Sequence, residues 1–223
     1  MHKLVFGMQL ISIRRTVMTA TASLAVFGAS AAWCETASFD RDSLGTHPNG
    51  WSCGVTGRGA PKWSVEAEDG APSPPNVLKQ SGSGTFPWCV LQGTNIADGF
   101  VEVKFKSIAG KEDQAGGVIW RFKDDDTYYV ARANALENNV SLYYTERGRR
   151  NTLKYVDAPV PINAWHTLRV EYQAARIKVM LNGRTYIELE DKNISGRGSV
   201  GVWTKADSVT AFDDFTVGGT TGR

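Results

Sequence analysis

The chain has 223 residues, of which 25 are Lys or Arg and 23 are Asp or Glu, giving a formal net charge of +2. A charge this close to neutral provides no basic surface for a phosphate backbone, so nucleic acid is excluded as an expected partner. The three cysteines form no CxxC pair and no Cys/His cluster, which excludes a zinc site of the usual spacing.

The first 32 residues are predicted to be a signal peptide. Lys3, Arg14 and Arg15 precede an acid-free, largely apolar run that ends in small residues with the A-x-A spacing of a cleavage site. The run is too short and too rich in Ser, Thr and Gly to span a membrane. We therefore expect export to the periplasm or the extracellular space, with no transmembrane segment after removal. The alternative is an N-terminal extension that is not removed.

Residues 33–223 are predicted to form one domain. Three basic residues and no acid would leave with the signal peptide, so 22 basic residues remain against 23 acidic ones. About 190 residues suit a single all-β domain, which commonly reaches this size undivided. We expect this domain to be a monomer.

Alternating sequences predict strands after a loop that we place at residues 71–88. In FVEVKFKSI, the apolar residues Val101, Val103 and Phe105 alternate with charged ones, and eight similar short runs follow. In TLRVEY, Leu168 and Val170 lie opposite polar neighbours in the same way. The pattern is typical of strands with one face in the core and one face in solvent, and burial of the apolar face supplies the main driving force.

Turn residues separate these runs. Asp124-Asp125-Asp126, Arg147-Gly148 and, most clearly, Asn182-Gly183 lie between consecutive runs. An Asn-Gly pair predicts a two-residue hairpin, because a type I′ turn needs a positive φ at both central positions. No window predicts an amphipathic helix of three turns. Short strands separated by such turn residues predict an all-β jelly-roll sandwich of two antiparallel sheets.

The cysteines leave two possibilities open. In an oxidising compartment Cys53 and Cys89 are the better candidates for a disulfide. The alternative is that Cys89, within FPWCVL, is a buried free thiol. Cys34 lies beside the predicted cleavage point.

Four stretches carry a resemblance to a known family. GKEDQAGGVIWRFKDDDTYYVARANALENNVSLYY, AWHTLRVEY, VMLNGRTYIELED and GSVGVWTKADSVTAFDDFTV are similar to the 3-keto-disaccharide hydrolases, also described as 3-keto-glucoside lyase/hydratase domains. The resemblance covers residues 39–217. It implies a concanavalin A-like or laminin-G-like jelly roll whose curved sheet forms an open groove, and a carbohydrate ligand. The chain would then bind a glycoside, or hydrolyse or eliminate from a 3-keto-glycoside. The alternative is a structural or protein-interaction module of the cell envelope.

The predicted groove is expected to bind sugar through aromatic faces and polar groups. In YYVARANA, Tyr128, Val130, Arg132 and Asn134 share one strand face, and we expect Arg132 and Asn134 at the end of the strand to project into the groove or over its rim. Sugars need flat rings and groups that bind vicinal hydroxyls. The candidate ligand-binding residues are Trp120, Arg132, Asn134, Glu137, Asn139, Tyr143, Trp203 and Lys205.

Each of these candidates has a structural alternative. The tryptophans can be core residues, and Arg132 can pair with Glu137 to hold the turn. Trp203 and Lys205 share a face opposite Val200 and Val202, which favours a partly wet face for both. If Arg132 binds the ligand, Arg132→Ala is expected to abolish glycan binding and to leave the melting temperature nearly unchanged.

No catalytic residue is carried over from the family. Retaining glucanases of this fold need carboxylates on one strand face, but Glu66-Ala67-Glu68 and Glu188-Leu189-Glu190 do not continue to a third acid. His166 shares the face of Leu168 and is expected to be structural. Glu137 and Asp207 remain as distant candidates for a general base in 3-keto-sugar chemistry.

A structural calcium ion is a further expectation. Asp213 and Asp214 precede the last apolar strand, and Asp40 lies near the start of the predicted domain. Calcium prefers six to eight oxygen ligands, of which such carboxylates would supply some. The alternative is that one aspartate holds the turn and the other is solvated.

Overall fold

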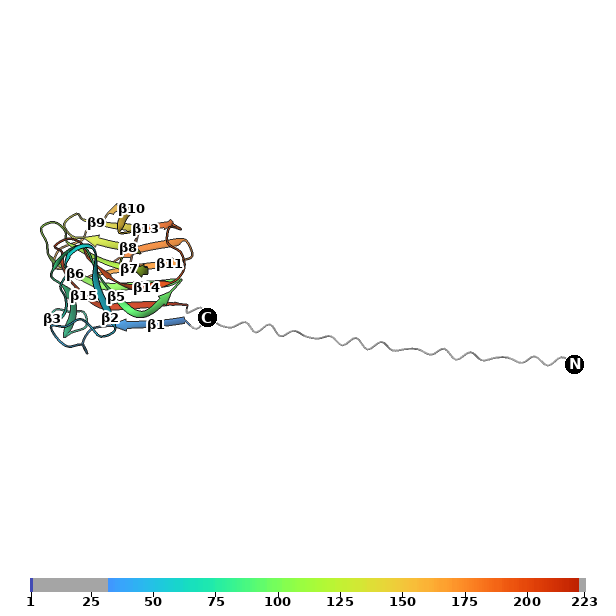
Figure 1. Ribbon diagram of the computed structural model, residues 1–223, viewed down its shortest axis with the longest axis horizontal. Coiled ribbons are helices and arrows are strands. Elements are labelled where there is room, and N and C mark those ends of the chain that lie inside the picture. The colour runs from blue at the N-terminus through green and yellow to red at the C-terminus, as the bar shows by residue number, and fades with distance from the viewer. Residues whose placement is uncertain (2–31, 221–223) are drawn as a thin grey trace.

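The computed structural model describes Met1 and residues 32–220. The predicted signal peptide therefore lies almost entirely outside the described residues. Within them the chain forms fifteen β-strands and no helix (Figure 1). All strand pairs are antiparallel, and the strands make one sheet of eight and one of seven. The predicted all-β sandwich of two antiparallel sheets is confirmed.

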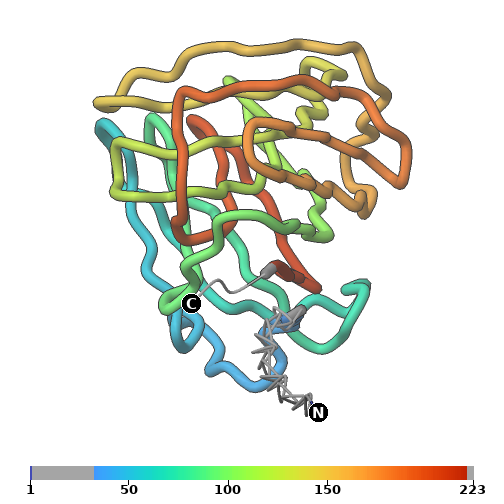
Figure 2. The backbone as a smooth tube through the Cα atoms, turned by 90° about the vertical axis from the view of Figure 1, so that its right-hand side faces the viewer, coloured from blue at the N-terminus to red at the C-terminus, as the bar shows by residue number. Residues whose placement is uncertain are grey.

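The two sheets interleave segments that lie far apart in the sequence. The eight-stranded sheet has the order β13 (Arg184–Glu190), β12 (Arg176–Leu181), β11 (His166–Gln173), β6 (Gly99–Ala109), β15 (Val209–Thr220), β4 (Asn76–Gln80) and β3 (Trp63–Ala67), with β1 (Ala32–Ala37) paired to β15. The seven-stranded sheet has the order β10 (Arg149–Asp157), β9 (Asn139–Glu146), β8 (Thr127–Asn134), β7 (Ala115–Asp124), β14 (Gly198–Trp203), β5 (Ser83–Ile96) and β2 (Trp51–Ala60). Strand β10 therefore forms one edge of the seven-stranded sheet (Figure 2).

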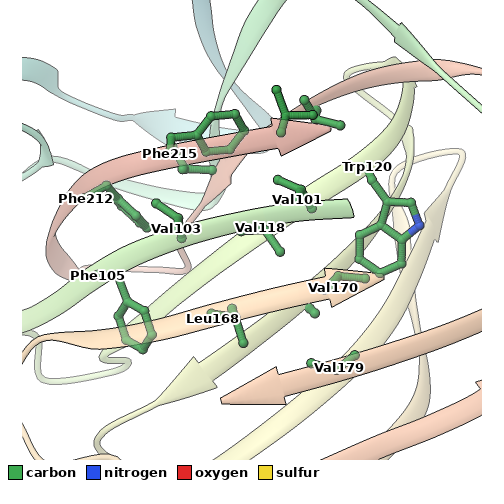
Figure 3. Close-up of a cluster of buried hydrophobic side chains, with 14 of the residues drawn as sticks. Val101, Val103, Phe105, Val118, Trp120, Leu168, Val170, Val179, Phe212 and Phe215 are labelled. Atoms are coloured by element: carbon green, nitrogen blue, oxygen red, sulfur yellow. The ribbon is translucent and has the colours of Figure 1, made fainter. Parts of the chain in front are cut away.

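The main core lies between the sheets. Val101, Val103 and Phe105 of β6 and Leu168 and Val170 of β11 are fully buried there, as the alternation predicts. Figure 3 shows these side chains together with others from both sheets. Burial of apolar surface at about 25 cal/mol per Å² makes this layer the principal source of stability.

The predicted hairpins are confirmed. Asn182 and Gly183 join β12 to β13 with φ values of 51° and 78°, and Arg147 and Gly148 join β9 to β10 with 51° and 71°. Positive φ at both central residues is the condition for a type I′ turn, whose twist matches that of the two strands. The three aspartates at 124–126 likewise lie at the turn between β7 and β8.

The loop predicted at residues 71–88 is wrong from residue 76 onward, apart from the short turn between β4 and β5. Strand β4 begins at Asn76, and β5 already begins at Ser83. Proline, serine and glycine in this stretch indicate a loop locally, but Val77 and Leu78 are buried, and β4 is held between β3 and β15. The neighbours that stabilise this strand come from distant parts of the chain.

Cys53 of β2 and Cys89 of β5 form a disulfide, which decides between the two alternatives. The two residues face each other directly across the antiparallel pair. Cys34 is free and exposed. A disulfide is typical of proteins in oxidising compartments, so this bond is consistent with export. No helix within residues 32–220 has the length and apolar character needed to cross a membrane.

Candidate functional site

The seven-stranded sheet has a second buried face, directed away from the main core. On β8, Tyr129, Ala131 and Ala133 face the core, whereas Tyr128 and Val130 belong to a separate apolar cluster on the outer side. The predicted division of this strand is therefore confirmed. The outer cluster consists of Trp88, Val90, Ala115, Ile119, Tyr128, Val130, Tyr143 and Trp203, with Phe86 and Phe122 packed against it.

One end of this outer face gathers the polar residues that the sequence singles out. Strand β8 ends at Asn134, β9 begins at Asn139, and β14 ends at Trp203, shortly before Lys205. We call the polar group at this end the Asp113 cluster. It consists of Asp113, Arg132, Asn134, Glu137, Asn139 and Lys205.

Asp113 is the centre of this cluster, and the sequence analysis did not identify it. Its side chain is fully buried and accepts hydrogen bonds from Arg132 Nη1 at 3.0 and 2.8 Å. Asn134 Nδ2 donates to it at 3.0 Å and Lys205 Nζ at 2.7 Å. Burying a carboxylate is costly unless cations and hydrogen-bond donors surround it, and four donor contacts meet that condition here.

Asp207 fixes the loop that carries Asp113. Its carboxylate accepts hydrogen bonds from the backbone N–H groups of Lys111, Glu112 and Asp113 at 2.7, 3.0 and 3.2 Å. These backbone hydrogen bonds lower the pKa of Asp207. Gly110 opens the loop with a φ of 148°, and a Cβ there would lie 1.8 Å from the carbonyl oxygen of Asp113. Asp207, which we considered as a base, is therefore occupied in holding a loop.

Glu137 is the accessible acid of the cluster. Arg132 Nη2 donates to Glu137 Oε2 at 2.6 Å and Asn139 Nδ2 donates to the same oxygen at 2.9 Å, while 39% of the Glu137 side chain remains exposed. Burial alone would raise the pKa of Glu137, but the hydrogen bond from Asn139 and the charges of Arg132 and Lys205 outweigh it and lower the pKa. Glu137 is thus an ionised carboxylate in a fixed position.

The pairing of Arg132 with Glu137 confirms the structural alternative for that arginine. Arg132 is only 1% exposed and is held by two acids, so it has no free edge for bidentate binding of a sugar. Asn134 is also engaged, because its Oδ1 accepts the backbone N–H groups of Leu136 and Glu137. The expectation that Arg132→Ala would leave the melting temperature unchanged is not supported by this geometry.

A row of directly paired residues, three of them aromatic, crosses the outer face beside the cluster. Directly paired residues of successive strands form the row Tyr155, Ser141, Arg132, Gly117, Trp203, Trp88 and Gly54. The indoles lie over the glycines, since a Cβ on Gly54 would be 2.6 Å from the Trp88 ring and one on Gly117 would be 3.3 Å from Trp203. Trp203 is fully buried and stacks on Phe86 at 5.6 Å.

The predicted open groove is therefore largely filled. Tyr128, Val130, Tyr143 and Trp203 have no exposed surface, because side chains pack across the middle of the outer face. What remains accessible is the end with Glu137 and Lys205, together with the edge strand β10. Neither of the two described cavities, of about 750 and 400 Å³, is lined by any of the predicted ligand-binding residues.

Trp120 does not belong to this face. It is fully buried in the main core, where it stacks on Tyr129 at 5.2 Å and on Tyr172 at 5.9 Å. Figure 3 shows it among the core side chains, close to Val170. Its neighbour Ile119 faces outward instead. Because both residues are apolar, the sequence does not indicate which of them faces the core.

His166 is structural, as expected, and Glu66 and Glu68 form ion pairs away from the cluster. His166 is 5% exposed, its Nε2 lies 2.9 Å from the carbonyl oxygen of Pro161, and Asn182 Nδ2 lies 3.1 Å from its Nδ1. Glu66 and Glu68 form ion pairs with Lys79 and Lys106 on the outer face of the other sheet. None of these groups lies in the Asp113 cluster.

The residues proposed for calcium do not form a metal site. Ser73 N donates to Asp213 at 2.7 Å, Lys104 Nζ to Asp214 at 2.7 Å, and Asn76 N to Asp40 at 3.1 Å. Protein donors therefore take up the oxygens that a cation would need. Across residues 32–220 no group of three or more His, Cys, Asp or Glu side chains is arranged to hold a metal ion.

Asp213 instead predicts a pH dependence of stability. Burial raises the pKa of Asp213 to about 6, from an ordinary value of 3.8, and the charges of Asp214 and Asp40 add to this rise. Between these two pH values the folded chain binds a proton that the unfolded chain lacks, so stability increases as the pH falls through 6. Two pKa units correspond to about 2–3 kcal/mol in total, of which roughly half is gained by pH 5. We expect the urea midpoint to rise between pH 7.5 and pH 5.

The variant Asp213→Asn should show a smaller rise over the same range, because it has no proton to gain. Glu66, Glu137, Asp207 and Asp214 have lowered pKa values, so their stabilising contributions are lost only at more acidic pH. An equal rise in the variant and the wild type would exclude Asp213 as the source.

Comparison with known proteins identifies the family. Residues 35–217 match the 3-keto-alpha-glucoside-1,2-lyase-like domain. No curated protein sequence matches the chain significantly.

Solved structures with the same fold have little sequence identity to the chain. The carbohydrate-binding module CBM66 from Bacillus subtilis has 19% identity and a TM-score of 0.62, covering 75% of this chain and 94% of its own. A Bacillus subtilis protein of unknown function with a galectin-like fold has 13% identity and a TM-score of 0.57, with coverage of 78% and 90%. The Crh5 transglycosylase has 14% identity and a TM-score of 0.58, with coverage of 86% and 85%. At such identities these structures establish the fold, and the family match confirms the resemblance seen in the sequence. The chain belongs to the 3-keto-alpha-glucoside-1,2-lyase-like domain family.

Proposed function

We propose that this chain binds a glycoside of the 3-keto-α-glucoside class at the Asp113 end of the outer face of the seven-stranded sheet. The observation that carries the proposal is a pair of accessible, oppositely charged groups, Glu137 and Lys205, held in place by the buried Asp113 and Arg132. Because these two groups are already fixed before a ligand arrives, little side-chain entropy is lost on binding.

The exposed groups of the cluster suit a polar ligand. The Glu137 carboxylate can accept hydrogen bonds and the Lys205 ammonium can donate them, so together they offer partners for the hydroxyl groups of a sugar. Family membership points to the same ligand class.

Elimination is a second candidate, favoured by the exposed position of the Glu137 carboxylate in the same cluster as the Lys205 ammonium. A ketone at C3 of a glucoside acidifies the hydrogen on C2. A carboxylate can remove that proton, the C1–C2 double bond forms, and the C1–O bond breaks with its electron pair on the leaving oxygen. In this reaction Glu137 would be the base, and the Lys205 ammonium would stabilise the negative charge on the C3 oxygen.

One titration tests both candidates. p-Nitrophenyl 3-keto-α-glucoside is added to the protein while heat is recorded by calorimetry and free p-nitrophenolate by absorbance. We expect binding to the wild type and at least about tenfold weaker binding to Glu137→Gln, since a hydrogen bond to a charged group is lost. Release of p-nitrophenolate by the wild type but not by Glu137→Gln would indicate elimination.

The matched control is Glu68→Gln, which removes an acid from the outer face of the opposite sheet. It should bind as the wild type does. If the wild type shows no binding heat at millimolar ligand, the proposal is wrong, and the structural or protein-interaction module becomes the better description.

A further inference from the structure

Arg150 of the edge strand β10 lies in a box of aromatic rings on the same outer face. Its guanidinium carbon is 4.2 Å from the centre of the Tyr143 ring, 4.9 Å from Phe86 and 5.9 Å from Trp203. Contacts between a guanidinium and aromatic faces are favourable and fix the orientation of the planar group.

The guanidinium of Arg150 has no acidic partner among the described residues. No carboxylate of residues 32–220 forms an ion pair with it, and its Nη1 is buried without a hydrogen-bond partner. Arginine is almost never fully buried unless it is paired, and a buried donor without a partner is rare. Arg132, which contacts the same tyrosine ring at 5.8 Å, differs in having both Asp113 and Glu137.

Arg150 therefore leaves an uncompensated positive charge beside the candidate site. Within the site the two other cations, Arg132 and Lys205, are balanced by Asp113 and Glu137. The guanidinium carbons of Arg150 and Arg132 are at most about 10 Å apart, because both lie against Tyr143. That distance is comparable with the size of one or two sugar rings.

We propose that Arg150 binds the carboxylate of a uronic acid unit, so that the preferred glycoside is acidic; this inference rests on the proposed function. The aromatic rings occupy the faces of the guanidinium and leave its edge for hydrogen bonds. The donors of a guanidinium lie in its plane, in a fork that matches the two oxygens of a carboxylate. Arg150 is only partly buried, and Nη1 is its one buried, unpartnered donor, so the Nε–Nη2 edge is the one that a ligand can reach from solvent.

Two ligands that differ only at C6 test the inference. One is p-nitrophenyl 3-keto-α-glucoside, and the other is its counterpart with a carboxylate at C6. We expect the wild type to bind the acidic ligand about tenfold more tightly, as a charge-assisted, bidentate contact predicts. In Arg150→Gln the two affinities should agree within about twofold, because the charge and the fork are both lost.

Arg149→Gln is the matched control, since it removes the same charge from the neighbouring, exposed position on β10. Arg149→Gln should keep the preference for the acidic ligand. This result would show that Arg150 contacts the carboxylate directly and that the overall electrostatic field of the protein does not cause the preference. Arg150→Lys retains the charge without the fork and should keep only part of the preference for the acidic ligand. The melting temperatures of the Arg150 and Arg149 variants are measured alongside, to confirm that all of them are folded.

The outcomes separate the two proposals. Equal affinity of the wild type for both ligands, or a preference that survives in Arg150→Gln, would overturn the role of Arg150 and leave the proposed function intact. Failure of the wild type to bind either ligand would overturn the proposed function and this inference with it.

Discussion

Replacing Arg132 by Met is expected to lower the free energy of unfolding by about 3–5 kcal/mol. The substitution keeps most of the side-chain volume but takes two of the four hydrogen-bond contacts from the buried Asp113 carboxylate. The Asp113 carboxylate would stay desolvated while keeping only one of its two cationic partners, so the loss exceeds what the ion pair with Arg132 itself contributes. Urea denaturation followed by circular dichroism measures the change.

Two further variants identify the cause of this loss. Adding Asp113→Asn to Arg132→Met removes the buried charge that keeps only Lys205 as its cation, so the double variant should recover about 1–3 kcal/mol relative to additivity. Lys79→Met breaks a partly exposed pair with Glu66 and should cost less than about 1 kcal/mol. A loss in Arg132→Met as small as that in Lys79→Met would show that the Asp113 cluster does not stabilise the fold.

Removing the disulfide with Cys53→Ala and Cys89→Ala is expected to cost about 3 kcal/mol. The bond closes a loop between residues 36 positions apart, and a cross-link of this length restricts the unfolded chain by an amount in the range of about 2–4 kcal/mol. Since Cys89 is fully buried in the main core, alanine there also removes packing contacts. The unfolding free energy, measured with and without dithiothreitol, provides the test.

Dithiothreitol should destabilise the wild type and leave the double variant unaffected. Cys34→Ala is the control, because this cysteine is exposed and unpaired, and it should change stability by less than about 0.5 kcal/mol. A wild type whose unfolding curve is the same under oxidising and reducing conditions would contradict a stabilising disulfide.

Much of the fold could be predicted from the sequence, because its strands each carry a local signal. Strands β6, β11 and β12 bury one face each, so their alternation is complete, and the Asn182-Gly183 turn has no common alternative to a hairpin. Strand β4 has no such signal. Its five residues, next to two prolines, become a strand only because β3 and β15 lie on either side.

The candidate site was predictable only where its residues lie on one strand or turn. Arg132, Asn134 and Glu137 are close in sequence, so alternation and the turn bring them together. Asp113 contacts Lys205 across 92 positions, and no local pattern distinguishes it from the acid beside it. Arg150 has the same difficulty, since its aromatic neighbours come from β5, β9 and β14. The filled groove was also unpredictable, because side-chain packing across a sheet depends on register.

The location of the bound ligand tests the central claim most directly. Two-dimensional amide spectra of the labelled protein, recorded while p-nitrophenyl 3-keto-α-glucoside is added, report which residues it touches. The account predicts shifts concentrated at residues 134–139, at Lys205 and around Arg150. Shifts confined instead to the cavity on the opposite sheet, lined in part by Phe100 and Arg169, would contradict it.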